Sequence, residues 1–163
     1  MKKSITYKRL HKFDVVATAY LIENGYYVSA ISAIGETPSK AAKYTDKVPT
    51  KLVANIKNII KQTDALYEDF NEKKTIIFID NALEDDKTKA ILYDDTKDGN
   101  GNVVRNYKFS KDGQKKVNEE VKKLMNEEVE IHVRITEGEL GLTEEEKDAF
   151  NGIVIPEFTP DED

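Results

Sequence analysis

The first apolar residues of the chain recur every three or four positions, which is the spacing of one face of an α-helix. The stripe lies in the segment TYKRLHKFDVVATAYLIENG and consists of Leu10, Phe13, Ala17, Tyr20 and Leu21. Asn24 and Gly25 follow it, and both residue types take the left-handed backbone that ends helices. We therefore predict a helix that ends near Asn24, with residues 4–7 as a candidate short strand before it.

The longest apolar periodicity runs from about residue 48 to residue 83 and predicts one long helix. Pro49 and Thr50 are residue types that open helices. The β-branched run from Thr75 to Ile79 would also suit a strand, but no glycine or proline interrupts residues 50–98. Such a helix would span about 50 Å, which is long for a globular core and suggests a helical arm or hairpin. Its expected apolar face consists of Leu52, Ile56, Ile59, Thr63, Leu66 and Phe70.

Three further runs have the composition of β-strands. Residues 90–94 and 103–109 flank a glycine-rich turn, which is typical of a β-hairpin. Residues 128–135 alternate strictly between apolar and polar side chains, as in a half-buried strand. Residues 27–34 fit either a strand or a short helix.

Two shorter helices are also expected. The first covers residues 110–125, with Ser110 or Asp112 as its cap. The second lies in LTEEEKDAFNG, where Thr143 and Glu146 have the spacing of a capping box. The apolar run IVIPEF after it predicts a last short strand.

Together these elements predict an α+β fold in a single domain of 163 residues. A long helical arm (about 48–83) packs against the shorter helices, and a small antiparallel sheet lies within about residues 90–135. The expected strands of this one sheet are 90–94, 103–109 and 128–135, with residues 4–7 as a candidate fourth. An acidic segment, residues 137–163, completes the domain.

Charge is distributed unevenly along the chain. Residues 1–136 carry 24 basic and 21 acidic groups, whereas residues 137–163 carry 1 basic and 10 acidic groups. The protein is therefore a weakly basic body with an acidic end. No cysteine is present, which excludes disulfides, thiolate catalysis and cysteine-based zinc sites. No apolar run is long enough for a membrane span, and the basic first residues lack the apolar core of a secretory signal.

The segment DDTKDGNGNVV, residues 94–104, has the acidic and amide side chains of a calcium loop. The helix–loop–helix calcium site needs a glycine at its sixth position and a glutamate at its twelfth. If Gly99 is sixth, the twelfth residue is Arg105, and if Gly101 is sixth, it is Tyr107. Because neither can supply the carboxylate, and because Asp-Gly and Asn-Gly favour hairpin turns, we predict a turn.

The remaining candidate chemistry is sparse. The histidines, His11 and His132, have no paired spacing that would indicate a metal site. The chain has neither a phosphate-binding glycine loop nor a nucleophile-elbow motif. The overall acidity, with a pI near 5.1, argues against direct nucleic-acid binding. We therefore expect no catalytic, cofactor-binding or metal-binding residues and no enzymatic activity, and keep an enzyme whose site the sequence does not reveal as an alternative.

Several segments resemble the small uncharacterised proteins encoded in tailed-phage genomes, which are grouped as a domain of unknown function. The resemblance covers about residues 48–140. It rests on a long helix containing LYEDFNEKK, the turn DGNGN, the segment YKFSKDG, a further helix and the closing LMNEEVEIHVRI. The resemblance implies a phage-encoded protein that works by contact with other proteins, for example in virion assembly.

The expected function is that of a non-enzymatic protein-binding or assembly module, acting as a virion structural or assembly protein. The alternative is a phage-encoded inhibitor of a host defence or nucleic-acid-binding protein, which would use an acidic surface. The expected location is the host cytoplasm or the virion, without membrane insertion.

Two surfaces are the candidates for partner binding. Exposed acids near the C-terminus could meet a basic partner, or the basic residues 1–12 of the chain itself. These acids are Glu144, Glu145, Asp148 and the tail Asp161–Asp163. The long helix could mediate self-association, unless the N-terminal helix covers its apolar face within one chain. The residues of that face are Leu52, Ile56, Ile59, Leu66 and Phe70.

Overall fold

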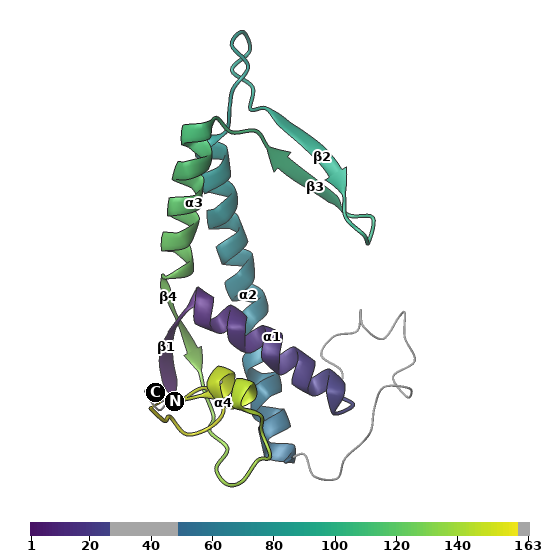
Figure 1. Cartoon of the computed structure of the whole chain (residues 1–163), viewed down its shortest axis with the longest axis vertical. Coiled ribbons are helices and arrows are strands. Elements are labelled where there is room, and N and C mark those ends of the chain that lie inside the picture. The colour runs from purple at the N-terminus through teal and green to yellow at the C-terminus, as the bar shows by residue number, and fades with distance from the viewer. Residues whose placement is uncertain (27–48, 160–163) are drawn as a thin grey trace. The chain divides into compact units, whose positions relative to one another are not determined.

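The computed structural model describes residues 1–26 and 49–159, and over these residues it confirms the predicted α+β class (Figure 1). The helices are α1 (Tyr7–Glu23), α2 (Thr50–Asn81), α3 (Lys111–Met125) and α4 (Glu144–Phe150). The strands are β1 (Lys2–Thr6), β2 (Tyr93–Lys97), β3 (Val103–Tyr107) and β4 (Glu128–His132). The predictions for residues 27–34 and for the Asp161–Asp163 tail lie outside the described residues.

The chain divides into two compact units, and α2 contributes to both. The first unit comprises Met1–Leu66 and Glu128–Asp163, and the second comprises Tyr67–Glu127. Helix α2 begins at Thr50, close to the predicted start, and continues without a break to Asn81. The run from Thr75 to Ile79 is therefore helical, which confirms the long-helix prediction over the strand alternative.

Helix α1 belongs to the first unit, and its predicted stripe is buried. The exposed fraction is 0% for Leu10, Phe13, Ala17 and Leu21 and 5% for Tyr20. The Thr6 hydroxyl accepts a hydrogen bond from the Arg9 N–H at 3.1 Å and so caps the helix. Asn24 caps the other end, and Gly25 has a φ of 83°, as predicted for a helix stop.

Helix α4 packs on α1 through aromatic contacts within the first unit. The ring of Phe150 lies 5.6 Å from that of Phe13 and 5.7 Å from that of Tyr20. The predicted capping box is present, because Thr143 and Glu146 exchange side-chain and backbone hydrogen bonds.

The strands form two separate sheets of two strands each, which corrects the prediction of one sheet. Among the described strands, β4 pairs antiparallel with β1, in the register Lys3 opposite Ile131, and β2 pairs with β3. The physical reason is burial. The β1–β4 pair places Ile5 and Ile131 in the core, but the β2–β3 hairpin has polar residues on both faces and offers no apolar face for a third strand.

The second unit joins the last part of α2, the β2–β3 hairpin and α3. Ser110 caps α3 by accepting from the Gly113 N–H at 3.0 Å. Gly113 lies close to the end of α2, because a Cβ there would be 3.1 Å from the Asn81 carbonyl oxygen. Asn81 also donates to Glu120 at 3.3 Å, and Lys73 lies 3.4 Å from Glu127. These contacts hold α3 alongside α2 in a helical hairpin (Figure 1).

Aromatic rings attach the β2–β3 hairpin to this helical pair. The ring centroid of Phe78 on α2 lies 6.0 Å from the centroids of Tyr107 and Phe109. Tyr107 also contacts Tyr93 across the hairpin, with centroids 6.3 Å apart. An isolated two-stranded hairpin is marginally stable in water, so these contacts explain why the hairpin is ordered.

The predicted last strand, in IVIPEF, is instead a tight turn. The Phe150 carbonyl accepts from the N–H groups of Ile153 at 3.0 Å and Val154 at 3.2 Å, and Gly152 has a φ of 69°. Only an isolated bridge joins Asn151 and Ile155. In this turn the three consecutive apolar side chains Ile153, Val154 and Ile155 are buried. The prediction failed because such an apolar run is also typical of a buried strand.

Candidate protein-binding surfaces

Three residues of the predicted self-association face lie in the core of the first unit. Leu52, Ile56 and Ile59 are 0% exposed, so they cannot meet a second folded copy. This part of α2 contacts a distant segment of the same chain, since Asn55 donates to the Thr136 hydroxyl at 2.7 Å. These three side chains are therefore buried within one chain.

Leu66 and Phe70, the other two residues of that face, are half-buried. The more exposed apolar residues of α2 are Ile76 and Ile79, at 56% and 39%. At about 100° per residue, they lie on a different face of the helix from Phe70. The sequence did not point to this face, because the longer stripe from Leu52 to Phe70 dominated the apolar pattern. The three-residue spacing between Ile76 and Ile79 is the signal that could have indicated it.

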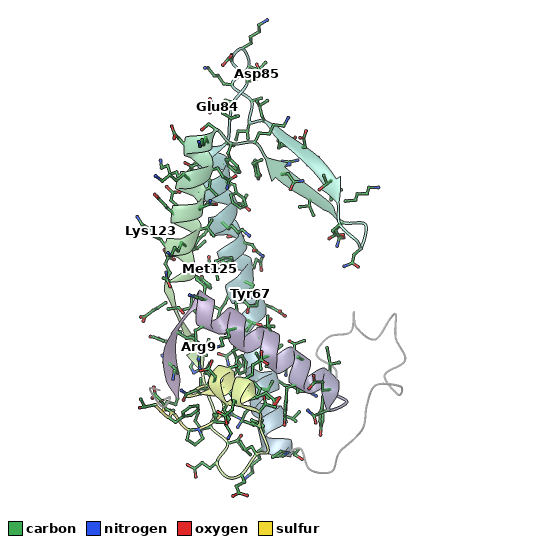
Figure 2. The ribbon with its side chains drawn as sticks, in the orientation of Figure 1. Arg9, Tyr67, Glu84, Asp85, Lys123 and Met125 are labelled. Atoms are coloured by element: carbon green, nitrogen blue, oxygen red, sulfur yellow. The ribbon has the colours of Figure 1, made fainter. Side chains whose placement is uncertain are left out.

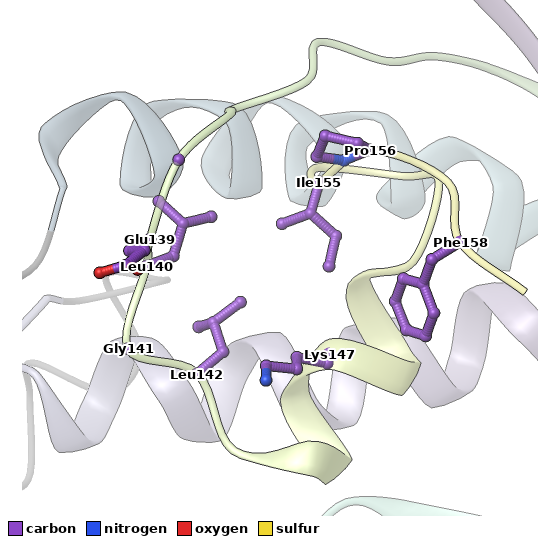
Figure 3. A pocket seen from close by; sticks show the side chains of 9 residues that line it. Glu139, Leu140, Gly141, Leu142, Lys147, Ile155, Pro156 and Phe158 are labelled. Atoms are coloured by element: carbon purple, nitrogen blue, oxygen red, sulfur yellow. The ribbon is translucent and has the colours of Figure 1, made fainter. Parts of the chain in front are cut away.

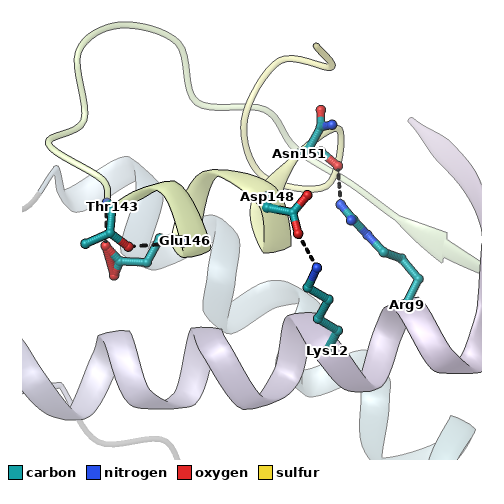
Figure 4. A network of polar contacts seen from close by, with 6 residues as sticks. All are labelled: Arg9, Lys12, Thr143, Glu146, Asp148 and Asn151. Atoms are coloured by element: carbon teal, nitrogen blue, oxygen red, sulfur yellow. Dashed lines mark hydrogen bonds and ion pairs between the residues drawn. The ribbon is translucent and has the colours of Figure 1, made fainter. Parts of the chain in front are cut away.

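The acidic residues of α4 differ in their surroundings. Glu144, at the start of the helix, has a 94% exposed side chain, and Glu145 beside it is also exposed. Asp148 instead forms an ion pair with Lys12 of α1 (Figure 4). The hydrogen bond from Lys12 lowers the pKa of Asp148, and the charge of Arg9 adds to this effect.

A second contact joins the basic N-terminal region to the end of α4. The Arg9 guanidinium donates to the Asn151 carbonyl at 2.8 Å, beside the Lys12–Asp148 pair (Figure 4). The acidic end of the chain therefore meets the basic start within one chain at this point. Of the three α4 acids that the sequence suggested for partner binding, Glu144 and Glu145 are exposed, whereas Asp148 is paired with Lys12 of α1.

The packing of α4 on α1 also affects a titratable group, Tyr20. Burial raises its pKa to about 12, and the nearby Glu146 carboxylate adds to the increase. Its ring stands edge-on to Phe150. The phenol is therefore a structural group of the α1–α4 contact.

The glycine-rich loop between β2 and β3 is a turn, as predicted. One carboxylate oxygen of Asp98 accepts from the N–H groups of Asn100 and Asn102, both at 2.9 Å. The Asp98 N–H donates to the Asn102 carbonyl, also at 2.9 Å, and Gly101 has a φ of 81°. The acidic side chain that suggested a calcium ligand thus stabilises the backbone of the turn.

Within residues 1–26 and 49–159, no group of three or more histidine, aspartate or glutamate side chains is arranged to hold a metal ion. His132 lies exposed on β4, and His11 lies exposed on α1. No helix in the described ranges has the length and apolarity needed to cross a membrane.

A shallow hollow lies beside α4 in the first unit (Figure 3). Its volume is about 500 Å³, and Leu140, Leu142 and Ile155 point into it, with Lys147 and Phe158 at the side. Lys147 lies 3.5 Å from Glu144, so its charge is already partly compensated. The hollow is mainly apolar.

The second unit has the larger share of the exposed apolar side chains. Of the eleven large apolar residues that are exposed in the described part of the chain, seven belong to this unit. They are Ile76, Ile79, Leu83, Leu92, Tyr93, Val103 and Val104. Exposed apolar side chains concentrated in this way are typical of protein contact surfaces.

The β2–β3 hairpin carries a stacked cation. The Arg105 guanidinium lies 3.8 Å from the centroid of the Tyr93 ring and 3.4 Å from the Asp95 carboxylate. Val103 and Val104 on the same strand are 65% and 41% exposed. Arginine and tyrosine are enriched at protein interfaces, because both combine apolar area with hydrogen-bonding groups.

Comparison of the chain with protein-family models, with curated proteins and with solved structures finds no match in any of the three.

Proposed function

We propose that the protein is a non-enzymatic protein-binding or assembly module, of the type implied by the resemblance to tailed-phage proteins. The observation that carries this proposal is the concentration of exposed apolar side chains in the second unit. Exposed apolar area has a free-energy cost in water that binding removes. The partners are proteins, including a second copy of the chain, and the location is the host cytoplasm or the virion.

We assign the β2–β3 hairpin to a partner that is another protein rather than a second copy of this chain. It carries the Arg105–Tyr93 stack and Val103 on one face and Val104 on the other, and every residue of its two strands except Tyr107 is exposed. An exposed hairpin also has edges whose N–H and C=O groups can pair with another chain. A partner could therefore add a strand to the hairpin as well as cover its side chains.

Affinity capture with matched variants tests this proposal. Val103→Glu with Val104→Thr removes the apolar groups but keeps favourable cross-strand pairs, because Lys97 and Thr96 lie opposite. The control is Val15→Glu on α1, where the original valine is 55% exposed. A partner captured from host lysate should be lost with the hairpin variant and kept with the control.

Loss of the partner with both variants, or with neither, would contradict the assignment to the hairpin. Circular dichroism of each variant would show that the helices and strands remain. Mass spectrometry of purified phage particles would then distinguish a virion component from a protein that acts only in the infected cell.

The second candidate function, inhibition of a basic host protein, is favoured by the exposed acids of α4. Glu144 and Glu145 lie in the first turn of the helix, and the side chain of Glu144 is 94% exposed. Such a contact would weaken steeply as salt is added, whereas a contact through apolar residues would not. Capture at low and high salt therefore separates the two candidates.

A further inference from the structure

The dipeptide Asn-Gly, which is prone to a spontaneous rearrangement, occurs at three places in the chain. These are Asn24–Gly25, Asn100–Gly101 and Asn151–Gly152. Glycine has no Cβ, so its backbone nitrogen can approach the side-chain carbonyl carbon of the asparagine before it. That attack closes a succinimide ring and releases ammonia. The surroundings of each dipeptide therefore decide which one reacts in the folded protein.

The dipeptide that follows α4 is restrained at both reacting groups. The side-chain amide of Asn151 donates to the Phe158 carbonyl at 2.8 Å and accepts from the Phe158 N–H at 2.8 Å. Gly152 is buried, and its N–H donates to the Ile155 carbonyl at 3.0 Å. The attacking nitrogen and the attacked carbon can meet only after this turn opens.

The dipeptide at the end of α1 is restrained by the helix cap. The side-chain nitrogen of Asn24 donates to the Tyr20 carbonyl at 2.8 Å, and the Gly25 N–H donates to the Ile22 carbonyl at 3.2 Å. Both residues of the dipeptide are half-buried. Rotation of the Asn24 side chain toward Gly25 would therefore break bonds that end the helix.

The dipeptide in the β2–β3 turn has open surroundings. Asn100 and Gly101 are both exposed, and the turn lies at the free end of the hairpin, away from the loop of Glu84 and Asp85 (Figure 2). A Cβ added at Gly101 would meet no atom of the described residues within 4 Å. The Gly101 N–H donates to the Asp98 carbonyl at 3.1 Å. An exposed turn of a two-stranded hairpin opens at low cost, so this bond protects the nitrogen only weakly.

We propose that Asn100 is a site of spontaneous modification, at which the backbone nitrogen of Gly101 displaces ammonia from the side-chain amide. A bond forms between the Gly101 nitrogen and Cγ of Asn100, and the bond from Cγ to the side-chain nitrogen breaks. The Gly101 nitrogen loses its proton to solvent, and the departing nitrogen takes up a proton. Water then opens the ring at either carbonyl, which gives aspartate or isoaspartate.

Both products change the tip of the hairpin. Each adds a negative charge close to Asp98, and isoaspartate also inserts a carbon atom into the main chain of the turn. The inference goes beyond the proposed function, because the reaction requires only water and no partner.

Incubation of the full chain at mildly alkaline pH, followed by tryptic peptide mapping, tests the proposal. Trypsin places the three asparagines in separate peptides, residues 13–40, 98–105 and 148–163. We expect the mass gain of an amide-to-acid conversion in peptide 98–105. It should appear at least about tenfold faster than in peptide 148–163, because opening the Asn151 site breaks more hydrogen bonds. Peptide 13–40 should also convert more slowly, and an isoaspartate-specific methyltransferase should label peptide 98–105.

Two controls separate the effect of the fold from that of the dipeptide. Asn100→Gln keeps an amide but would need a larger ring, so the mass gain in peptide 98–105 should be lost. In guanidinium chloride, where the fold is lost, Asn24, Asn100 and Asn151 should convert at similar rates. The proposal is overturned if Asn100 stays intact in the folded protein or if Asn151 converts as fast. A rate difference that persists in guanidinium chloride would likewise exclude the fold as its cause.

Discussion

The side-chain amide of Gln62 forms two hydrogen bonds with the backbone of His132, donating to its carbonyl at 2.8 Å and accepting from its N–H at 2.7 Å. His132 is the last residue of β4, and β1 pairs with the other edge of that strand. Gln62 on α2 therefore occupies the position that a third strand would take. The β1–β4 pair is thus closed on one side by a helix side chain.

We expect Gln62→Ala to lower the free energy of unfolding by about 1–2 kcal/mol, because the substitution leaves both backbone groups of His132 without this partner. Urea unfolding followed by circular dichroism measures the change. Gln114→Ala is the control, since the Gln114 side chain on α3 donates to the exposed side chain of Asn118 at 3.0 Å. Equal losses for both variants would show that Gln62 has no special role.

The contribution of the Lys12–Asp148 ion pair to stability can be tested by exchanging the two charges. Asp148→Lys should destabilise the protein by about 1 kcal/mol, because it brings a third cation toward Lys12 and Arg9, and the partly exposed pair is screened by water. Lys12→Asp added to Asp148→Lys should restore most of the stability. Glu145→Lys makes the same charge change at a residue with no described ion pair, and it should lower the free energy of unfolding by less. Failure of the double variant to recover would mean that the pair contributes nothing.

The same pair makes the free energy of unfolding depend on pH in the acidic range. The pKa of Asp148 is lowered in the folded protein, so its contribution is present above the ordinary aspartate pKa. The contribution is lost as the pH falls through the lowered value. Asp148→Asn should remove this part of the acid dependence, and a profile that is unchanged in Asp148→Asn would contradict the assignment.

Tyr20 predicts a loss of stability at high pH. Its ordinary pKa is 10.0 and its folded pKa is about 12, so the neutral phenol stabilises the fold fully below about pH 10. This stabilisation, on the order of 2 kcal/mol, should disappear between about pH 10 and about pH 12. Urea unfolding of Tyr20→Phe and of the unchanged protein over this range measures the difference. Parallel curves for the two proteins would exclude Tyr20 as the cause.

The hairpin turn predicts no calcium binding in the micromolar range. The Asp98 carboxylate already accepts two backbone hydrogen bonds. Arg105 and Tyr107 occupy the two candidate positions at which a calcium loop would need its glutamate. Calorimetric titration with calcium should give only heats of dilution. Micromolar binding that Asp98→Ala abolishes would refute this prediction.

The sequence by itself determined the local elements of this protein. Helix α1, the long helix α2 and the capping box of α4 follow from spacing and from residues within one or two helical turns, such as Asn24 and Thr143. The Asp98–Asn102 turn follows for the same reason, because its hydrogen bonds join residues only two to four positions apart. Such interactions depend little on the rest of the chain.

The tertiary structure alone decided which elements pair and which apolar faces are covered. The partner of β4 is β1, at the other end of the sequence, and the alternation in residues 128–135 could not reveal it. Likewise, one continuous stripe on α2 is buried at Ile56 and only half-buried at Phe70, because different elements surround the helix along its length. Periodicity shows that a face is apolar, but long-range packing determines whether the same chain covers it.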